Sequence, residues 1–138
     1  KGGHSAIVAT EGNSDCHLIL RGGKQPNYDA THVAAACSEL AASGLAERVM
    51  IDFSHANSSK QFARQIEVGA DVASQLASGE RRVVGVMIES HINEGRQDLV
   101  RDQSLRYGVS ITDACIGFAH TETLLEDLAT AVRQRRAG

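Results

Sequence analysis

Apolar segments of strand length alternate with helix-like segments along this chain, and most of the apolar segments end abruptly in polar residues. The centres of four apolar segments lie about thirty residues apart on average, at Ile19, Ile51, Val86 and Ile111, which is the length of one strand–helix unit in a (β/α)8 barrel of about 250 residues. Parallel strands need a long crossover connection, usually a helix, and the crossover is right-handed. The alternation therefore predicts an α/β fold with a parallel sheet.

Local patterns predict where these elements begin and end. We expect strands over residues 16–20, 48–53, 83–88 and 110–116. We expect helices over 30–42, from Ser58 or Ser59 to about 79, and over 121–136, the last with one apolar face of Leu124, Leu125, Leu128 and Val132. The first of these helices should end at Ser43-Gly44, since glycine is common just after a helix.

Two further segments depart from the strand–helix repeat. A short strand over 5–10, followed by turn residues at 11–15, predicts a small N-terminal β-hairpin with the strand at 16–20. Residues 93–108 are polar and lack helical periodicity, so we expect a long irregular connection in place of a helix. Such connections are often functional, but a plain solvent loop is an equally good interpretation.

Length and charge limit the classes of function. The 138 residues allow a single domain over 1–138, and the formal net charge of −3 gives no basic surface for nucleic acid. No apolar run approaches the ~20 residues that span a bilayer, so no membrane partner is expected. Three cysteines without a CxxC spacing favour reduced thiols and a cytoplasmic location. Because Lys1 is not an initiator methionine, we expect the chain to be a fragment.

One imidazole and two carboxylates stand at or near the ends of three different expected strands. They are His55, Glu89 and Asp113, and the carboxyl ends of parallel strands meet at one edge of a sheet or barrel. A lone histidine is more often structural than a ligand, but the two carboxylates favour a metal site. A mixed nitrogen and oxygen set suits Mn, Fe, Co or Zn rather than calcium.

Other residues near these strand ends allow two interpretations each. Arg21, beside Gly22 and Gly23, suits a phosphate or carboxylate, but a structural arginine at a tight turn is at least as good an interpretation. Asp52 either orients a substrate hydroxyl or is a buried acid paired with a base. Cys115 would share a face with Asp113 in a regular strand, although packing is the favoured role. His91 is expected behind the ligands or on the surface.

Four segments of the chain resemble one enzyme family. Leu20–Gly23, Asp52–Lys60, Gly85–His91 and Ser110–Gly117 resemble the class I 3-deoxy-D-arabino-heptulosonate 7-phosphate (DAHP) synthases. The resemblance covers essentially the whole chain, and the segment Asp52–Lys60 is its most specific part. It implies the C-terminal half of a TIM (β/α)8 barrel, about strands five to eight with their helices.

The resemblance also implies a reaction and residue roles. The family condenses phosphoenolpyruvate with erythrose 4-phosphate, the first step of the shikimate pathway of aromatic amino acid biosynthesis, and requires a divalent metal. Carried onto matching positions, His55, Glu89 and Asp113 resemble three of the four metal ligands. Arg21 and His55 resemble residues that hold phosphoenolpyruvate. Asp52 resembles a residue near the aldose, so Asp52 and His55 are the candidate catalytic residues.

Parts of the family pattern have no counterpart in this sequence. The fourth metal ligand, a cysteine, and the Lys-Pro-Arg-Thr segment for erythrose 4-phosphate are absent, so we expect the chain alone to be inactive. Unpaired sheet edges and an open apolar face predict either self-association into a homo-oligomer or a poorly behaved monomer. Two alternatives remain: an enzyme like 3-deoxy-D-manno-octulosonate 8-phosphate synthase, which uses a different aldose phosphate, and a non-catalytic folded half-barrel module.

Overall fold

A three-stranded parallel sheet forms the centre of the fold in a computed structural model, which describes residues 3, 5–13 and 15–138; residues 1, 2, 4 and 14 lie outside that description. The strands, in spatial order, are β1 (Leu18–Leu20), β2 (Val49–Asp52) and β3 (Val83–Met87). A second parallel pair joins β4 (Ser90–His91) to β5 (Ile116–Gly117). The prediction of an α/β fold with parallel strands is confirmed.

Three helices accompany the strands: α1 (Ala30–Ala42), α2 (Gln65–Ala77), which follows the short 3-10 helix η1 (Phe62–Arg64), and α3 (Phe118–Ala137). The bounds of α1 match the expected ones, because both of its ends are encoded locally. The Asp29 carboxylate accepts hydrogen bonds from the backbone N–H groups of Thr31 and His32 at its start. After the C-cap Ser43, Gly44 takes the left-handed backbone conformation with φ 70°.

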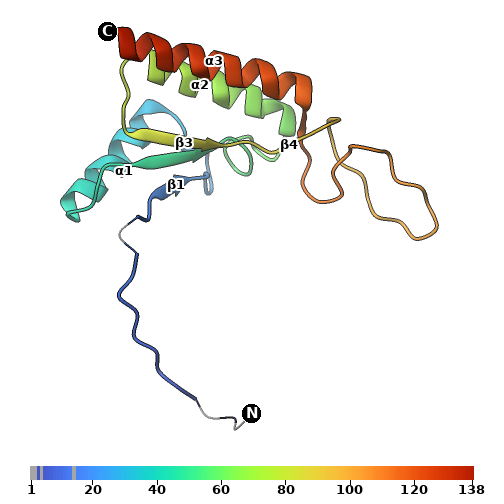
Figure 1. The fold of residues 1–138 in the computed structure, drawn as a ribbon, viewed down its shortest axis with the longest axis horizontal. Coiled ribbons are helices and arrows are strands. Elements are labelled where there is room, and N and C mark those ends of the chain that lie inside the picture. The colour runs from blue at the N-terminus through green and yellow to red at the C-terminus, as the bar shows by residue number, and fades with distance from the viewer. Residues whose placement is uncertain (1–2, 4, 14) are drawn as a thin grey trace.

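Helices α2 and α3 lie side by side over one face of the sheet (Figure 1). The buried core fills the space between sheet and helices and comprises Leu20, Val33, Cys37, Val49, Ile51, Phe53, Val68, Val72, Leu76, Val83, Ile116, Leu124, Leu128 and Ala131. The two helices approach closely at Gly69. A Cβ atom there would lie 2.3 Å from Leu124 Cδ1 and 2.9 Å from Phe53 Cε2, so only glycine fits without movement of its neighbours.

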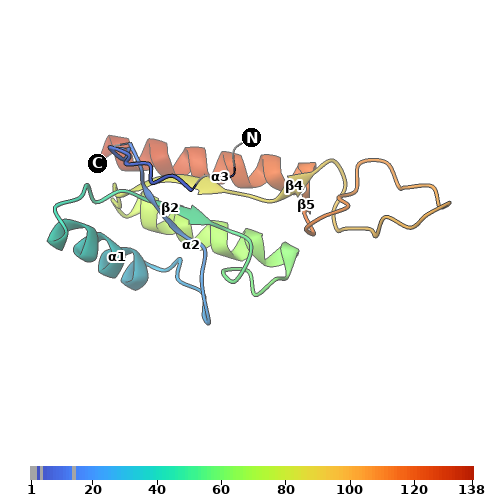
Figure 2. The ribbon, with the colours of Figure 1, turned by 90° about the horizontal axis from the view of Figure 1, so that it is seen from below.

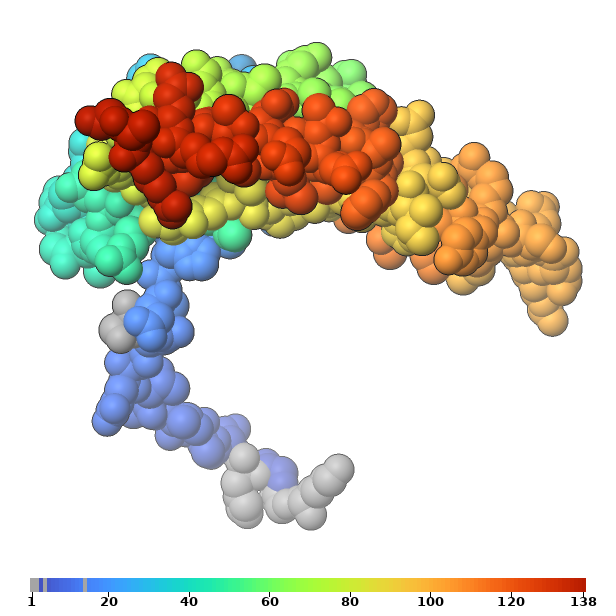
Figure 3. All heavy atoms as spheres, turned by 45° about the horizontal axis from the view of Figure 1, so that its top comes forward, coloured from blue at the N-terminus to red at the C-terminus, as the bar shows by residue number. Residues whose placement is uncertain are grey.

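Figure 2 views the sheet from below, the side away from α2 and α3. Ile19 of β1 and Val84 of β3 are 48% and 54% exposed, and Met50 of β2 is only half-buried. Figure 3 shows residues 5–13 and the loop over residues 93–108 extending from different parts of the body. Within the described residues, no helix is both long and apolar enough to cross a membrane.

The predicted N-terminal hairpin is wrong. Residues 5–13 form neither helix nor strand, and residue 14 of the expected turn lies outside the described residues. Ile7 is fully exposed and Val8 is 79% exposed. A short apolar segment becomes a strand only if a neighbour takes up its backbone hydrogen bonds and side chains, and the described part of the chain supplies none here.

The predicted fourth strand over 110–116 is also wrong, since only Ile116 and Gly117 pair as a strand, β5. Ser110 and Cys115 make isolated bridges to the loop, and the chain bends at 111–113 between them. The Ser110 hydroxyl accepts a hydrogen bond from the backbone N–H of Thr112 at 3.2 Å. Such local side-chain bonds compete with strand pairing. Asp113 therefore lies in a bend.

Two helix details differ from expectation as well. Ser58 and Ser59 do not cap α2, because Ser59 and Lys60 have left-handed φ values of 53° and 60° that no helix contains. The chain turns there, and α2 begins only at Gln65. In α3, Leu125 is 51% exposed rather than part of the buried face. That face instead comprises Thr121, Leu124, Leu128 and Ala131.

Candidate metal and anion site

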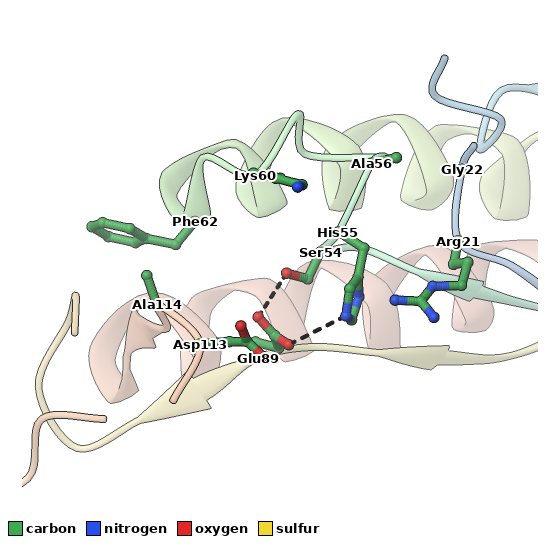
Figure 4. Close-up of a pocket in the computed structure, with 10 residues that line it drawn as sticks. All are labelled: Arg21, Gly22, Ser54, His55, Ala56, Lys60, Phe62, Glu89, Asp113 and Ala114. Atoms are coloured by element: carbon green, nitrogen blue, oxygen red, sulfur yellow. Dashed lines mark hydrogen bonds and ion pairs between the residues drawn. The ribbon is translucent and has the colours of Figure 1, made fainter. Parts of the chain in front are cut away.

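A pocket of about 500 Å³ lies at the carboxyl ends of β1, β2 and β3 (Figure 4). Arg21 follows β1, Ser54 and His55 follow β2, and Glu89 lies between β3 and β4. The remaining lining residues are Gly22, Ala56, Lys60, Phe62, Asp113 and Ala114. The pocket thus occupies the edge at which parallel α/β proteins bind their ligands.

The predicted metal-binding residues lie together in this pocket. His55, Glu89 and Asp113 each offer one ligand atom, and these atoms all lie within 4.8 Å of one another. His55 and Glu89 are half-buried, whereas Asp113 is exposed. One imidazole nitrogen and two carboxylate oxygens form a donor set that fits a transition-metal dication. Three protein donors also leave coordination positions open for other ligands.

Asp52 orients the His55 ring. The Asp52 side chain is buried, and its Oδ2 lies 2.8 Å from His55 Nδ1 while its Oδ1 accepts the backbone N–H of Ser54 at 2.8 Å. His55 Nδ1 is buried and has no hydrogen-bond partner among the described residues, so its contact with Asp52 is a close approach rather than a hydrogen bond. The other ring nitrogen, Nε2, faces Glu89 Oε1 at 3.9 Å. A carboxylate behind a histidine is the usual support of a metal ligand.

Glu89 is held by two residues that the sequence interpretation did not select. Ser54 Oγ donates a hydrogen bond to Glu89 Oε2 at 2.7 Å. The fully buried Gln65 accepts from the Glu89 backbone N–H at 2.8 Å and donates to the Glu89 carbonyl oxygen at 3.0 Å. Ser54 lies inside the specific segment and could have been found there. Gln65 could not, because a contact across 24 residues leaves no local pattern.

Asp113 has no comparable support. Its carboxylate makes no hydrogen bond or ion pair within the described part of the chain, and it sits in the bend over 111–113. The neighbouring Cys115 is buried, and its Sγ lies 3.4 Å from the Asp113 carbonyl oxygen. Burial raises the pKa of the Cys115 thiol, so the thiol is neutral at pH 7. Packing, the favoured role, fits this environment.

Two cationic side chains line the pocket beside the predicted metal cluster. Figure 4 shows the Arg21 guanidinium pointing toward the His55 ring. Lys60, which was not predicted as a site residue, lines the pocket from the turn after β2. A guanidinium next to a metal cluster suits a phosphate or carboxylate ligand. His91 is exposed and lies outside the pocket, with its Nδ1 accepting the backbone N–H of Ile92.

Comparisons with known proteins converge on one family. Residues 2–126 match the model of the DAHP synthetase I family. A Phe-sensitive phospho-2-dehydro-3-deoxyheptonate aldolase of Escherichia coli (strain K12) is 60% identical over 136 residues, and a phospho-2-dehydro-3-deoxyheptonate aldolase of Haemophilus influenzae is 56% identical over 137 residues. Each alignment covers 99% of this chain, but only 39% and 38% of the relatives.

A solved structure gives the same result in three dimensions. The phospho-2-dehydro-3-deoxyheptonate aldolase of Francisella tularensis SCHU S4 superposes with a TM-score of 0.87 at 44% sequence identity. The match covers 94% of this chain and 38% of that one. The chain therefore spans about two fifths of the length of the relatives that it matches.

Proposed function

The chain belongs to the DAHP synthetase I family, and we propose that it provides part of the active site of a DAHP synthase. The proposed reaction joins phosphoenolpyruvate, erythrose 4-phosphate and water to give DAHP and inorganic phosphate. The observation that carries the proposal is the convergence of His55, Glu89 and Asp113 beside Arg21 in one pocket. The names of the relatives support the same activity.

We propose that residues 1–138 form one domain, the C-terminal half of a TIM barrel with about its fifth to eighth strands. The parallel order β1-β2-β3 and the helices on one face support this assignment. So does the superposition on part of the Francisella aldolase. The uncovered sheet face, with Ile19 about half exposed and Met50 half-buried, would then be the barrel interior. The exposed apolar surface also supports a homo-oligomer.

The predicted site residues have proposed roles. His55, Glu89 and Asp113 hold a divalent metal such as Mn, Fe, Co or Zn, which when bound acts as a Lewis acid on a carbonyl oxygen. Arg21 binds the phosphate or carboxylate of phosphoenolpyruvate, with the His55 ring next to that substrate. Asp52 is buried behind His55, so it orients the ring and reaches the aldose only through it.

We expect the 138-residue chain by itself to bind metal weakly and to form no DAHP. Three donors, one of them exposed and unsupported, give an open and weak site. Incubation with both substrates and Mn(II) tests this expectation, and robust formation of DAHP would contradict it. A non-catalytic folded module is the second candidate, favoured by the same weak site.

A chimera tests the proposed function without relying on the isolated chain. This chain would replace the matching segment of the Escherichia coli relative, to which it is 60% identical. We expect the chimera to form DAHP and the His55→Ala chimera to be inactive, whereas Glu67→Gln, at an exposed position outside the pocket, serves as the matched control. A folded but inactive chimera would refute the assignment.

The same chimera distinguishes the proposed DAHP synthase activity from that of an enzyme like 3-deoxy-D-manno-octulosonate 8-phosphate synthase. An eight-carbon product made from the three carbons of phosphoenolpyruvate requires a five-carbon aldose phosphate, one carbon longer than erythrose 4-phosphate. We expect turnover with the four-carbon substrate only. A preference for the five-carbon substrate, measured as the ratio of kcat/KM values, would favour the octulosonate enzyme instead.

A further inference from the structure

The turn that carries Arg21 packs directly against the segment that carries His55. Gly22 has φ 77°, and a Cβ atom there would lie 2.7 Å from Ala56 Cβ and 3.0 Å from the backbone nitrogen of Asn57. No side chain fits at position 22 without separating the two segments. The Arg21 and His55 arms of the pocket therefore meet through backbone, one residue beyond each functional side chain.

The Asn57 side chain joins the same segments by hydrogen bonds. It is 1% exposed, and its Nδ2 donates to the Leu20 carbonyl oxygen at 3.0 Å and to the Asp52 carbonyl oxygen at 2.7 Å. These carbonyls lie at the ends of β1 and β2. Its Oδ1 accepts the backbone N–H of Asn27 at 2.8 Å. Both amide donors and the oxygen are thus engaged, all with backbone groups.

Asn27 completes the connection from the other side. Its Oδ1 accepts the backbone N–H of Gly22 at 2.7 Å. Asn57 thus holds Leu20, which precedes Arg21, and Asn27 holds Gly22, which follows it. The backbone of Asn27 is in turn bonded to the Asn57 side chain. Loss of the Asn57 amide would leave two carbonyls in buried hydrogen bonds and one part-buried N–H without their partner, which opens the junction to water.

We propose that Asn57 is a positioning residue that fixes the Arg21 turn relative to His55 and so couples anion binding to metal binding. The coupling rests on the proposed function, because it assumes that Arg21 holds phosphoenolpyruvate and that His55 holds the metal. Asn57 itself does not line the pocket. Its effect on binding appears when both ligands must be held at one spacing, and that effect is a coupling free energy between the two sites.

The coupling is measured with the full 138-residue chain. Calorimetry gives the affinity for phosphoenolpyruvate with and without Mn(II), and Mn(II) electron paramagnetic resonance gives the reciprocal affinity. We expect each ligand to strengthen the other by about 5- to 150-fold in the wild type. In Asn57→Ala this factor falls to near one, whereas phosphoenolpyruvate affinity without Mn(II) changes little. A folded Asn57→Ala chain with the wild-type coupling factor overturns the proposal.

Amide hydrogen exchange tests the positioning role of Asn57 in the absence of any ligand. Amide hydrogen exchange at Gly22 should accelerate about tenfold or more in Asn57→Ala, because the clamp on the turn is lost. Amides within α2 should keep their wild-type rates. Unchanged exchange at Gly22 overturns the proposal. The activity of the chimera tests the proposed function separately, and if the isolated chain binds neither ligand, this exchange measurement alone decides the positioning role.

Two variants complete the test. Asn27→Ala removes only the acceptor for the Gly22 N–H, so it tests the same turn if Asn57→Ala does not fold, with the same expected and overturning results. Gln97→Ala is the matched control. The Gln97 amide also makes three hydrogen bonds with backbone groups, two to carbonyls and one from the Arg106 N–H, but it lies outside the pocket. It should leave Gly22 exchange unchanged.

Discussion

Glu89 and Asp113 are both carboxylates of the proposed metal cluster, yet the protein supports them very differently. Glu89 follows a paired strand, its carboxylate accepts a hydrogen bond from Ser54, and its backbone is held by the buried Gln65. Asp113 is exposed in a bend between two isolated bridges. A ligand whose position is fixed before binding loses little entropy on binding. The fold therefore holds one side of the proposed cluster in place, and we expect the other side to become fixed only on binding.

The surroundings of the two carboxylates differ in the same way. Glu89 follows β3 and contacts the buried Gln65 of α2, whereas Asp113 follows a loop whose Leu99 and Tyr107 are 71% and 84% exposed. A segment with little buried apolar surface opens at low free energy. The sheet and α2 thus build the site, and the loop only completes it.

Removal of each carboxylate gives the largest expected effect. Glu89→Gln should weaken Mn(II) binding more than about 100-fold, since loss of a supporting contact alone costs about 10–100-fold. Asp113→Asn should cost only about tenfold, because the binding free energy of that ligand already includes the cost of ordering its segment. Electron paramagnetic resonance of free Mn(II) measures both. Equal losses of Mn(II) affinity in the two variants would show that the two carboxylates do not differ in their support.

The buried amide behind Glu89 gives the next effect. Gln65→Met leaves the Glu89 N–H without its acceptor, which should lower the free energy of unfolding by about 2 kcal/mol. The Glu89 carbonyl keeps the Ile116 N–H at 3.0 Å, so the loss is limited to one group. Urea denaturation measures the change. Gln61→Met, at an exposed position outside the pocket, should leave the stability unchanged.

The Ser54 hydroxyl should contribute less. Ser54→Ala removes the 2.7 Å bond to Glu89 Oε2 and should weaken Mn(II) binding about tenfold. Ser54→Thr retains a hydroxyl on the same carbon and serves as the control. If the alanine variant binds Mn(II) as tightly as the wild type, Glu89 is not preformed by this bond.

A carboxylate outside the pocket gives the smallest effect. The hydrogen bond from Arg82 lowers the pKa of Glu80 below its usual value of 4.5. The pair therefore stabilises the fold above pH 4.5, and this stabilisation is lost as the pH falls through the lower, folded-state pKa. Glu80→Gln should cost below about 1 kcal/mol at pH 7.

The pH dependence of that cost is the measurement. Urea titrations of Glu80→Gln and the wild type should differ at pH 7 and converge in acid, while Mn(II) affinity at pH 7 stays unchanged. A difference in stability that persists below the folded-state pKa would show that the amide disturbs packing rather than charge.

The sequence predicted the elements and residues whose causes are local. Helix α1 has its own cap residues, and His55 and Glu89 stand where apolar strands end, so their placement followed from the chain itself. The strand over 110–116 failed because its apolar residues found no continuous partner. The contact between Gln65 and Glu89 exists in the structure but could not be predicted from the sequence. It depends on how α2 packs, and no local sequence pattern records that packing.

Gly69 makes the residues allowed at the contact between α2 and α3 depend on the position of the segment that carries His55. A methyl group at this position would press on Leu124 in α3 and on the Phe53 ring, which directly precedes Ser54 and His55. A larger residue at position 69 therefore fits only if the residue at position 124 is smaller. Otherwise it displaces Phe53 and with it the loop that carries His55. Across relatives, positions 69 and 124 should vary as a pair, and a survey of side-chain volumes at both positions would reveal that constraint.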